Sequence, residues 1–115
     1  MELLNSLIIE GTVGSPYVLI EQEGDRYIGR FTLEVKQEYK NQEGKTELEA
    51  CYFNTELSGN YAKRLEGIVK KGLEVRIVGK LKQAGTRVII AAEHIEFKLF
   101  KGRPEGNQEE QHLEF

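Results

Sequence analysis

The most informative run in this sequence is Lys70-Lys71-Gly72-Leu73-Glu74-Val75-Arg76-Ile77-Val78-Gly79-Lys80-Leu81. Two lysines followed by a glycine are typical of the end of a helix, because cations stabilise the negative end of the helix dipole and glycine adopts the left-handed conformation that stops it. Apolar residues then recur with a period of two at Val75, Ile77 and Leu81, which predicts a β-strand. We therefore expect a helix that ends at this glycine and a strand over residues 73–82.

The segment before this run has the spacing of a helix. Asn60 is a residue type that caps helix N-termini. The apolar residues after it recur at helical spacing, at Tyr61, Ala62, Leu65, Ile68 and Val69. These features predict one helix, over residues 60–72.

The rest of the chain predicts strands separated by turns. Alternating apolar and polar residues, which are typical of half-buried strands, occur most clearly over residues 27–39. Looser versions of the pattern predict further extended segments, over residues 3–13, 17–23, 48–57 and 87–97. Gly-containing turns separate these segments, at residues 23–25, 41–45 and 83–86.

Extended segments, then one helix, then two more strands fit the element order of an oligonucleotide/oligosaccharide-binding (OB) barrel, which has three strands, a helix and two strands, with the helix between strands three and four. We therefore predict an all-β, five-stranded OB-fold barrel. Gly11, Gly29 and Gly79 lie inside strand patterns, where glycine lets a strand bend sharply. The core is expected to contain five apolar residues, Phe31, Phe53, Leu57, Leu65 and Ile77.

Length and composition limit the class of protein. A chain of 115 residues has room for one domain, and 39% hydrophobic residues suffice for a small core. No apolar run is long enough to span a membrane, and the N-terminus lacks a signal-peptide pattern. The lone Cys51 excludes an internal disulfide and suits a reducing compartment. We expect a cytoplasmic protein that does not contact a membrane.

Residues that perform catalysis or bind metals are sparse. His94 and His112 lie far apart in the sequence, and no base, nucleophile or metal-ligand cluster occurs at the spacing of a motif. The sequence also lacks a glycine-rich phosphate-binding loop. We expect no enzymatic activity, no cofactor and no metal site.

The formal net charge of −3 is unevenly distributed. All 16 Lys and Arg residues lie at or before Arg103, whereas four of the 19 acidic residues lie beyond it, at Glu105, Glu109, Glu110 and Glu114. We predict a globular domain over residues 1–103 and a short, acidic, disordered tail over residues 104–115. Because the body is close to neutral, binding of a polyanion must depend on the local placement of its cations.

The chain resembles the bacterial single-stranded DNA-binding protein family over almost all of its body. The resemblance rests on an ordered set of segments, namely Asn5, residues 7–11, residues 30–35, Leu57-Ser58-Gly59, Ala62 and residues 70–81. It implies an OB-fold that binds single-stranded DNA without sequence preference in replication, recombination or repair. It also implies a homo-oligomer, a tetramer or a dimer.

Binding of this kind needs aromatic faces on which bases stack and cations that neutralise phosphates. The resemblance places Tyr39 and Tyr52 where the family carries stacking aromatic residues. Cations near Tyr39 and on the outward side of the strand over residues 73–82 complete the candidate site, namely Lys36, Lys40, Lys45, Arg76, Lys80 and Lys82. The alternative is that the tyrosines are ordinary strand residues and that the lysines only keep the hairpin soluble.

Three departures from the family pattern predict weaker binding or a shorter footprint. Ser58 stands where the family often has a stacking phenylalanine. The connection over residues 83–86 is short, whereas the family often has a long basic loop there. The chain also contains no Trp.

The C-terminal tail is similar to the acidic tip with which the family docks partner proteins. The resemblance implies that this segment binds replication or repair proteins through one anchored side chain and charge complementarity, with Glu110, Leu113, Glu114 and Phe115 as the binding residues. The tail lacks the proline and the aspartates of that tip. The alternative is a solvated chain end without a partner.

A second function stays open, because OB barrels host many functions. The near-neutral body and the few aromatic residues favour a protein-interaction or primosome-type accessory module with weak or no DNA binding. Tyr39, Tyr52 and the strand cations favour single-stranded DNA binding, of which RNA binding is a weaker variant.

Overall fold

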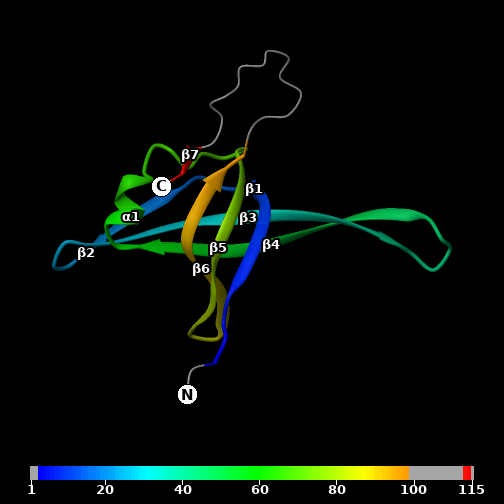
Figure 1. The fold of residues 1–115 in the computed structure, drawn as a ribbon, viewed down its shortest axis with the longest axis horizontal. Coiled ribbons are helices and arrows are strands. Elements are labelled where there is room, and N and C mark those ends of the chain that lie inside the picture. The colour runs from blue at the N-terminus through cyan, green and yellow to red at the C-terminus, as the bar shows by residue number, and fades with distance from the viewer. Residues whose placement is uncertain (1–2, 99–112, 115) are drawn as a thin grey trace, which may run out of the picture.

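The computed structural model describes residues 3–98 and the backbone of residues 113–114. Seven strands and one helix follow one another along the chain (Figure 1). Their bounds are β1 Leu7–Val13, β2 Val18–Gln22, β3 Arg26–Lys40, β4 Thr46–Ser58, α1 Gly59–Arg64, β5 Glu74–Ala84, β6 Arg87–Phe97 and β7 Leu113–Glu114.

Five strands close into a barrel in the order β1-β5-β6-β4-β3. The barrel closes because β1 pairs along Leu7–Thr12 with β5 and, at Thr12 and Val13, also with β3. All of these pairings are antiparallel except that of β4 with β6, and β2 adds to the outer edge of β3. The helix lies between the third and fourth barrel strands, so the predicted OB-fold is confirmed.

The core fills the barrel with residues from every barrel strand and from the helix region. Leu65 and Ile77 are completely buried, and Phe31 and Leu57 are nearly so, as predicted, and Leu33 is also completely buried. The prediction for Phe53 is wrong, because 38% of its side chain is exposed. Phe53 shares the inward parity of Leu33, but β4 pairs with β6 only at Thr55 and Glu56. On the edge of β4 away from β3, no described strand therefore pairs with Phe53.

The helix is shorter than its sequence pattern predicts. It ends at Arg64, and turns cover residues 65–68. Gly67 has a φ of +84°, and a left-handed residue at this point stops the helix before Lys70. The N-cap position is Ser58, whose side chain makes no capping hydrogen bond, so the assignment of Asn60 as the cap is wrong.

A bulge in the β5–β6 pair brings one glycine against the neighbouring backbone. Val78 pairs with His94 and Gly79 with Ala92, so one extra residue of β6 is left between them. A Cβ atom at Gly79 would overlap the carbonyl oxygen of Ala91. Glycine at this position therefore lets the strands bend around the barrel, as the sequence predicts.

The β3–β4 hairpin projects beyond the barrel as a long twisted arm, and its two strands cross in Figure 1. Its turn is organised by Asn41, whose Oδ1 accepts hydrogen bonds from the backbone N–H groups of Glu43 and Lys45. Outside the arm, β7 pairs with β6 at Glu96 and Phe97.

Candidate nucleic-acid interface

Strand register divides the side chains of the β3–β4 hairpin between two faces, because directly paired residues of an antiparallel ladder point the same way. The face that turns away from the barrel interior is called the outer face here. It consists of the pairs Arg30 with Glu56, Thr32 with Asn54, Glu34 with Tyr52, Lys36 with Ala50, Glu38 with Leu48 and Lys40 with Thr46.

A cleft of about 480 Å³ lies at the barrel end of the outer face. Its walls come from the β1–β2 connection, from the middle of β3 and β4, and from the tip of the β5–β6 hairpin, and it is lined by Ser15, Pro16, Val18, Arg30, Phe31, Thr32, Asn54, Thr55, Glu56, Ala84, Arg87 and Ile89. Arg30 forms an ion pair with Glu56 at 2.9 Å. Arg87 has no ion-pair partner among residues 3–98.

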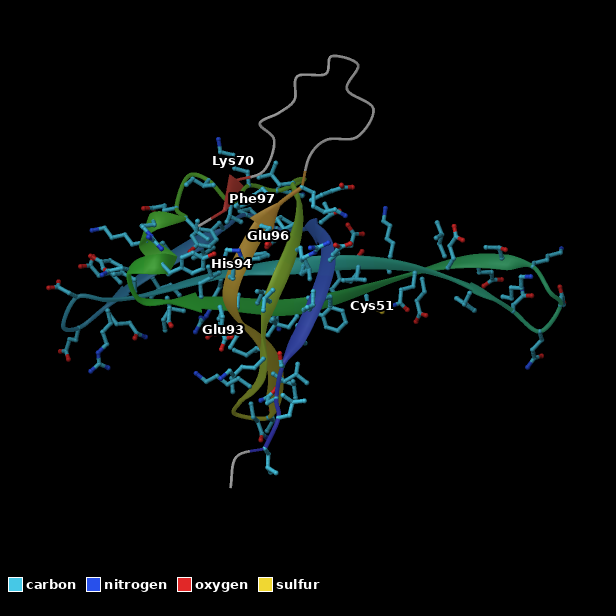
Figure 2. The ribbon with its side chains drawn as sticks, in the orientation of Figure 1. Cys51, Lys70, Glu93, His94, Glu96 and Phe97 are labelled. Atoms are coloured by element: carbon cyan, nitrogen blue, oxygen red, sulfur yellow. The ribbon has the colours of Figure 1, made fainter. Side chains whose placement is uncertain are left out.

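The outward side of β5 continues the surface of the cleft. Two of its three predicted cations form ion pairs. Lys82 pairs in register with Ile89 of the cleft and forms no ion pair with a described residue. Lys80 lies 3.3 Å from Glu93. Arg76 lies 2.8 Å from Glu10 and 3.6 Å from Glu96, and Figure 2 shows Glu93 and Glu96 along β6.

These contacts divide the predicted cations into two groups. The hydrogen bond to Glu10 raises the pKa of Arg76 and lowers the pKa of Glu10, so this exposed pair stays ionised across the working pH range. Arg76 and Lys80 therefore offer less positive charge to a phosphate than Lys82, whose ammonium group is unpaired within the described part of the chain.

The arm carries unpaired cations and one exposed tyrosine on the outer face. Lys36 and Lys40 share this face with Tyr52, whose side chain is 62% exposed. Neither lysine, nor Lys45 in the turn, forms an ion pair with any residue between 3 and 98. The Tyr52 hydroxyl donates a hydrogen bond of 3.2 Å to Glu34 Oε2. The negative charge of Glu34 and this hydrogen bond raise the pKa of the Tyr52 phenol.

Tyr39 lies on the opposite face of the hairpin from Tyr52. It pairs in register with Glu47, and its side chain is 46% exposed. Its hydroxyl donates a hydrogen bond of 3.0 Å to Glu47 Oε1, and this bond is the main cause of the raised pKa of Tyr39. The structure thus brings Tyr52, Lys36, Lys40 and Lys82 onto one surface, and it places Tyr39 across the arm from them.

Sequence reasoning missed the residues of the cleft. Arg87 comes directly after the two-residue turn at Gly85 and Thr86. Its position at the tip of a short hairpin was a sequence signal that could have identified it as a site residue. Arg30 and Asn54 lie on strands without any local signal, because only the register of β3 against β4 places them side by side with Thr32. The predicted tail residues Glu110 and Phe115 lie outside the described residues, and only the backbone of Leu113 and Glu114 is described.

Features of other classes of protein are missing from the described part of the chain. Residues 3–98 contain no group of three or more His, Cys, Asp or Glu side chains that could hold a metal ion. Among the same residues, no helix is long and apolar enough to cross a membrane.

A closed five-stranded OB barrel, with a cleft, unpaired cations and an exposed tyrosine on one face, defines the class of OB-fold nucleic-acid-binding modules. The model of the single-strand binding protein family matches residues 4–97. The chain belongs to this family. A comparison with curated protein sequences finds no match.

Solved structures of similar fold include single-stranded DNA-binding proteins from Plasmodium falciparum, Thermus aquaticus and Streptomyces coelicolor. The Plasmodium falciparum SSB in complex with ssDNA matches with a TM-score of 0.70 and 15% identity, over 80% of this chain and 89% of that one. A deletion variant of the single-stranded DNA-binding protein from Thermus aquaticus matches with a TM-score of 0.73 and 20% identity, over 96% of this chain and 54% of that one. The small single-stranded DNA-binding protein from Streptomyces coelicolor matches with a TM-score of 0.66 and 19% identity, over 85% of this chain and 96% of that one. This chain spans about half the length of the Thermus protein, and likeness at these identities shows the fold.

Proposed function

We propose that this protein binds single-stranded DNA without sequence preference during replication, recombination or repair, along a path from the cleft over the outer face to the arm and around the arm to Tyr39 on its other face. The observation that carries this path is the strand register, which puts Tyr52, Lys36 and Lys40 on the same face as the cleft residues Thr32 and Asn54. One continuous surface thus offers both an aromatic face for a base and cations for phosphates.

The charges of this surface suit the backbone of the strand. Arg87 and Lys82 lie beside the cleft, and Lys36 and Lys40 lie along the arm, all without ion-pair partners in the part of the chain that the structure describes. Contacts of this kind recognise phosphates and carry no sequence information. We expect the protein to act by binding alone, without catalysis, and to do so in the cytoplasm.

The apolar side chains at the N-terminal end support a homo-oligomer, a dimer or a tetramer. Leu3, Leu4 and Ile8 are 84%, 93% and 68% exposed, and Leu81 beside them is 51% exposed. The side chain of Asn5 bonds to both the N–H and the carbonyl of Leu81, which holds this segment against β5. Exposed apolar side chains of this kind support an interaction site, and sedimentation velocity of wild type and an Ile8→Glu variant tests it.

The chain is proposed to comprise an OB domain over residues 1–103 and a tail over residues 104–115 that docks replication or repair proteins. Its acidic residues and terminal Phe115 support this role. Binding of a peptide of residues 104–115 to such proteins tests it, with a peptide that lacks Phe115 as the control.

The function is tested by fluorescence anisotropy with a labelled oligo-dT and its duplex form at several salt concentrations. We expect tighter binding of the single strand, with log affinity falling linearly with log salt concentration because counterions are released. A flat titration at low salt would contradict DNA binding and favour the protein-interaction module instead.

Tyr52 and Tyr39 are tested as stacking residues by substitution with alanine. We expect Tyr52→Ala and Tyr39→Ala each to weaken binding by about 1–3 kcal/mol, the usual contribution of a base stacked on an aromatic ring. Leu48→Ala is the matched control, because Leu48 is 66% exposed on the same arm and has no aromatic ring. Equal affinities of Tyr52→Ala and Leu48→Ala would remove Tyr52 from the binding surface.

A further inference from the structure

Each exposed tyrosine of the arm donates its hydroxyl hydrogen bond to a glutamate directly across the hairpin. Tyr39 pairs with Glu47, and Tyr52 pairs with Glu34. The hydrogen bonds are 3.0 Å and 3.2 Å long. Direct cross-strand neighbours are close enough for such contacts. The same arrangement therefore occurs twice, once on each face of the arm.

Glu47 also connects Tyr39 to the turn at the tip of the arm. Its second carboxylate oxygen accepts a hydrogen bond of 2.9 Å from Asn41 Nδ2. Asn41 is itself fixed, because its Oδ1 accepts hydrogen bonds from the N–H groups of Glu43 and Lys45 at 2.9 Å and 3.0 Å. The phenol end of an otherwise exposed ring is thus anchored to the hydrogen-bonded turn at the tip of the arm.

We infer that Glu47 is a positioning residue for Tyr39, and that Glu34 has the same role for Tyr52. Each carboxylate holds the phenol end of the ring so that the ring face is presented to a base. The inference rests on the proposed function. A ring that is already fixed loses less side-chain entropy on binding, which raises affinity. The carboxylate also repels phosphates from the phenol end, so that a base rather than a phosphate meets the ring.

Glu49 provides a matched control for Glu47. It lies on the same strand and on the same face, in register with Gln37, and its side chain makes no hydrogen bond to a residue between 3 and 98. The negative charge of Glu49 also raises the pKa of Tyr39, but less than the hydrogen bond to Glu47 does. Glu47→Ala and Glu49→Ala therefore remove the same negative charge from the same face, and each change strengthens DNA binding by reducing repulsion. Only Glu47→Ala also releases Tyr39.

The experiment compares oligo-dT affinities of Glu47→Ala, Glu49→Ala, Tyr39→Phe and the double variant Tyr39→Phe/Glu47→Ala. We expect Glu47→Ala to bind about two- to tenfold more weakly than Glu49→Ala, the usual effect of one side chain that must be immobilised on binding. Once Tyr39 is phenylalanine, adding Glu47→Ala should change affinity only as Glu49→Ala does. Glu47→Gln, which keeps an acceptor oxygen, should bind at least as well as wild type.

Equal affinities of Glu47→Ala and Glu49→Ala, or independent effects of Tyr39→Phe and Glu47→Ala, would overturn the role of Glu47. Wild-type protein that binds no oligo-dT would instead overturn the proposed function. These two failures are distinguishable, because the first requires that wild type binds.

A measurement without DNA tests the tether alone. The hydrogen bond to Glu47 holds the pKa of the Tyr39 phenol above its ordinary value. NMR titration of labelled tyrosine should therefore show a lower midpoint for Tyr39 in Glu47→Ala than in Glu49→Ala. Identical midpoints would mean that the tether does not form in solution, and the inference would fail whatever the DNA affinities are.

Discussion

At the scale of single residues, the contact between Tyr17 and the helix region shows how one glycine shapes the fold. The Tyr17 hydroxyl donates a hydrogen bond of 2.6 Å to the carbonyl of Ala62, and its ring packs against Phe31. The phenol ring crosses β3 at Gly29, where a Cβ atom would overlap its hydroxyl. Gly29 thus lets the chain after β1 reach over β3 to the helix.

We predict that Gly29→Ala lowers the free energy of unfolding by about 1–3 kcal/mol, the usual effect of overpacking. The added methyl group displaces Tyr17 and its hydrogen bond to Ala62. Urea denaturation measures the change. Gly14→Ala is the control, because its Cβ would make only ordinary contacts. Equal denaturation midpoints for the two variants would contradict the close approach of Tyr17.

Tyr17 also predicts a dependence of stability on alkaline pH. Burial raises the pKa of its phenol to about 12, with a smaller effect of the negative charge of Glu66. The unfolded chain titrates near 10. Between these values the unfolded state loses the proton and the folded state keeps it, so stability is full below pH 10 and falls as the pH rises towards 12.

Urea midpoints measured from pH 9 to pH 11.5 check this expectation. Tyr17→Phe should be less stable than wild type at pH 9, because the bond to Ala62 is lost, and should lose less further stability as the pH rises. Parallel pH profiles for the two proteins would show that Tyr17 does not titrate at a raised pKa.

At the scale of elements, the arm shows both what the sequence predicts and what it does not. The alternation over residues 27–39 predicted a strand correctly, because a period of two leaves few alternatives. The same pattern did not reveal that Tyr39 and Tyr52 lie on opposite faces. That fact depends on the register of β3 against β4, which the turn at Asn41 sets.

The helix and the cleft show two further limits of sequence reasoning. Helical spacing continues to Val69, but the positive φ of Gly67 ends the helix earlier. Helix propensity alone does not tell whether one glycine stops a helix that five apolar positions favour. The cleft unites Ser15, Asn54 and Arg87, which lie far apart in the sequence. Only barrel closure brings them together, so no local motif could have predicted that site.

We predict that the double variant Lys36→Gln/Lys40→Gln makes the slope of log affinity against log salt shallower by about 1.4, which corresponds to two phosphates of a single strand. Both lysines lie on the outer face that also carries Tyr52. Lys70→Gln/Lys71→Gln is the control, since these exposed residues lie between α1 and β5. An unchanged slope in the first variant would place the phosphates elsewhere.

At the scale of the whole molecule, β7 and the cleft of the proposed DNA path lie at opposite ends of β6. The backbone of β7 pairs with β6 at Glu96 and Phe97, whereas the cleft adjoins β6 at Arg87 and Ile89, the other end of the strand. DNA binding and tail binding are therefore expected to be separable functions of one chain.

Deletion of residues 109–115 is predicted to leave the affinity for oligo-dT unchanged or slightly higher, because it removes acidic side chains that repel the strand. Anisotropy titration at low salt measures the effect. A full-length variant with Glu109, Glu110 and Glu114 changed to glutamine separates charge from chain length. Loss of DNA binding on deletion would contradict this division of roles.

The way in which the barrel closes has a consequence for how the chain folds. The β3–β4 hairpin joins residues close in sequence, so it can form early, whereas β1 must find β5 more than sixty residues away, as the Glu10–Arg76 contact illustrates. Until β1 docks, the backbone edges of β3 and β5 are unpaired and can accept a strand from another chain. Newly synthesised protein at high concentration should therefore exchange β1 between molecules, and dilute refolding should favour a barrel that closes with the β1 strand of its own chain.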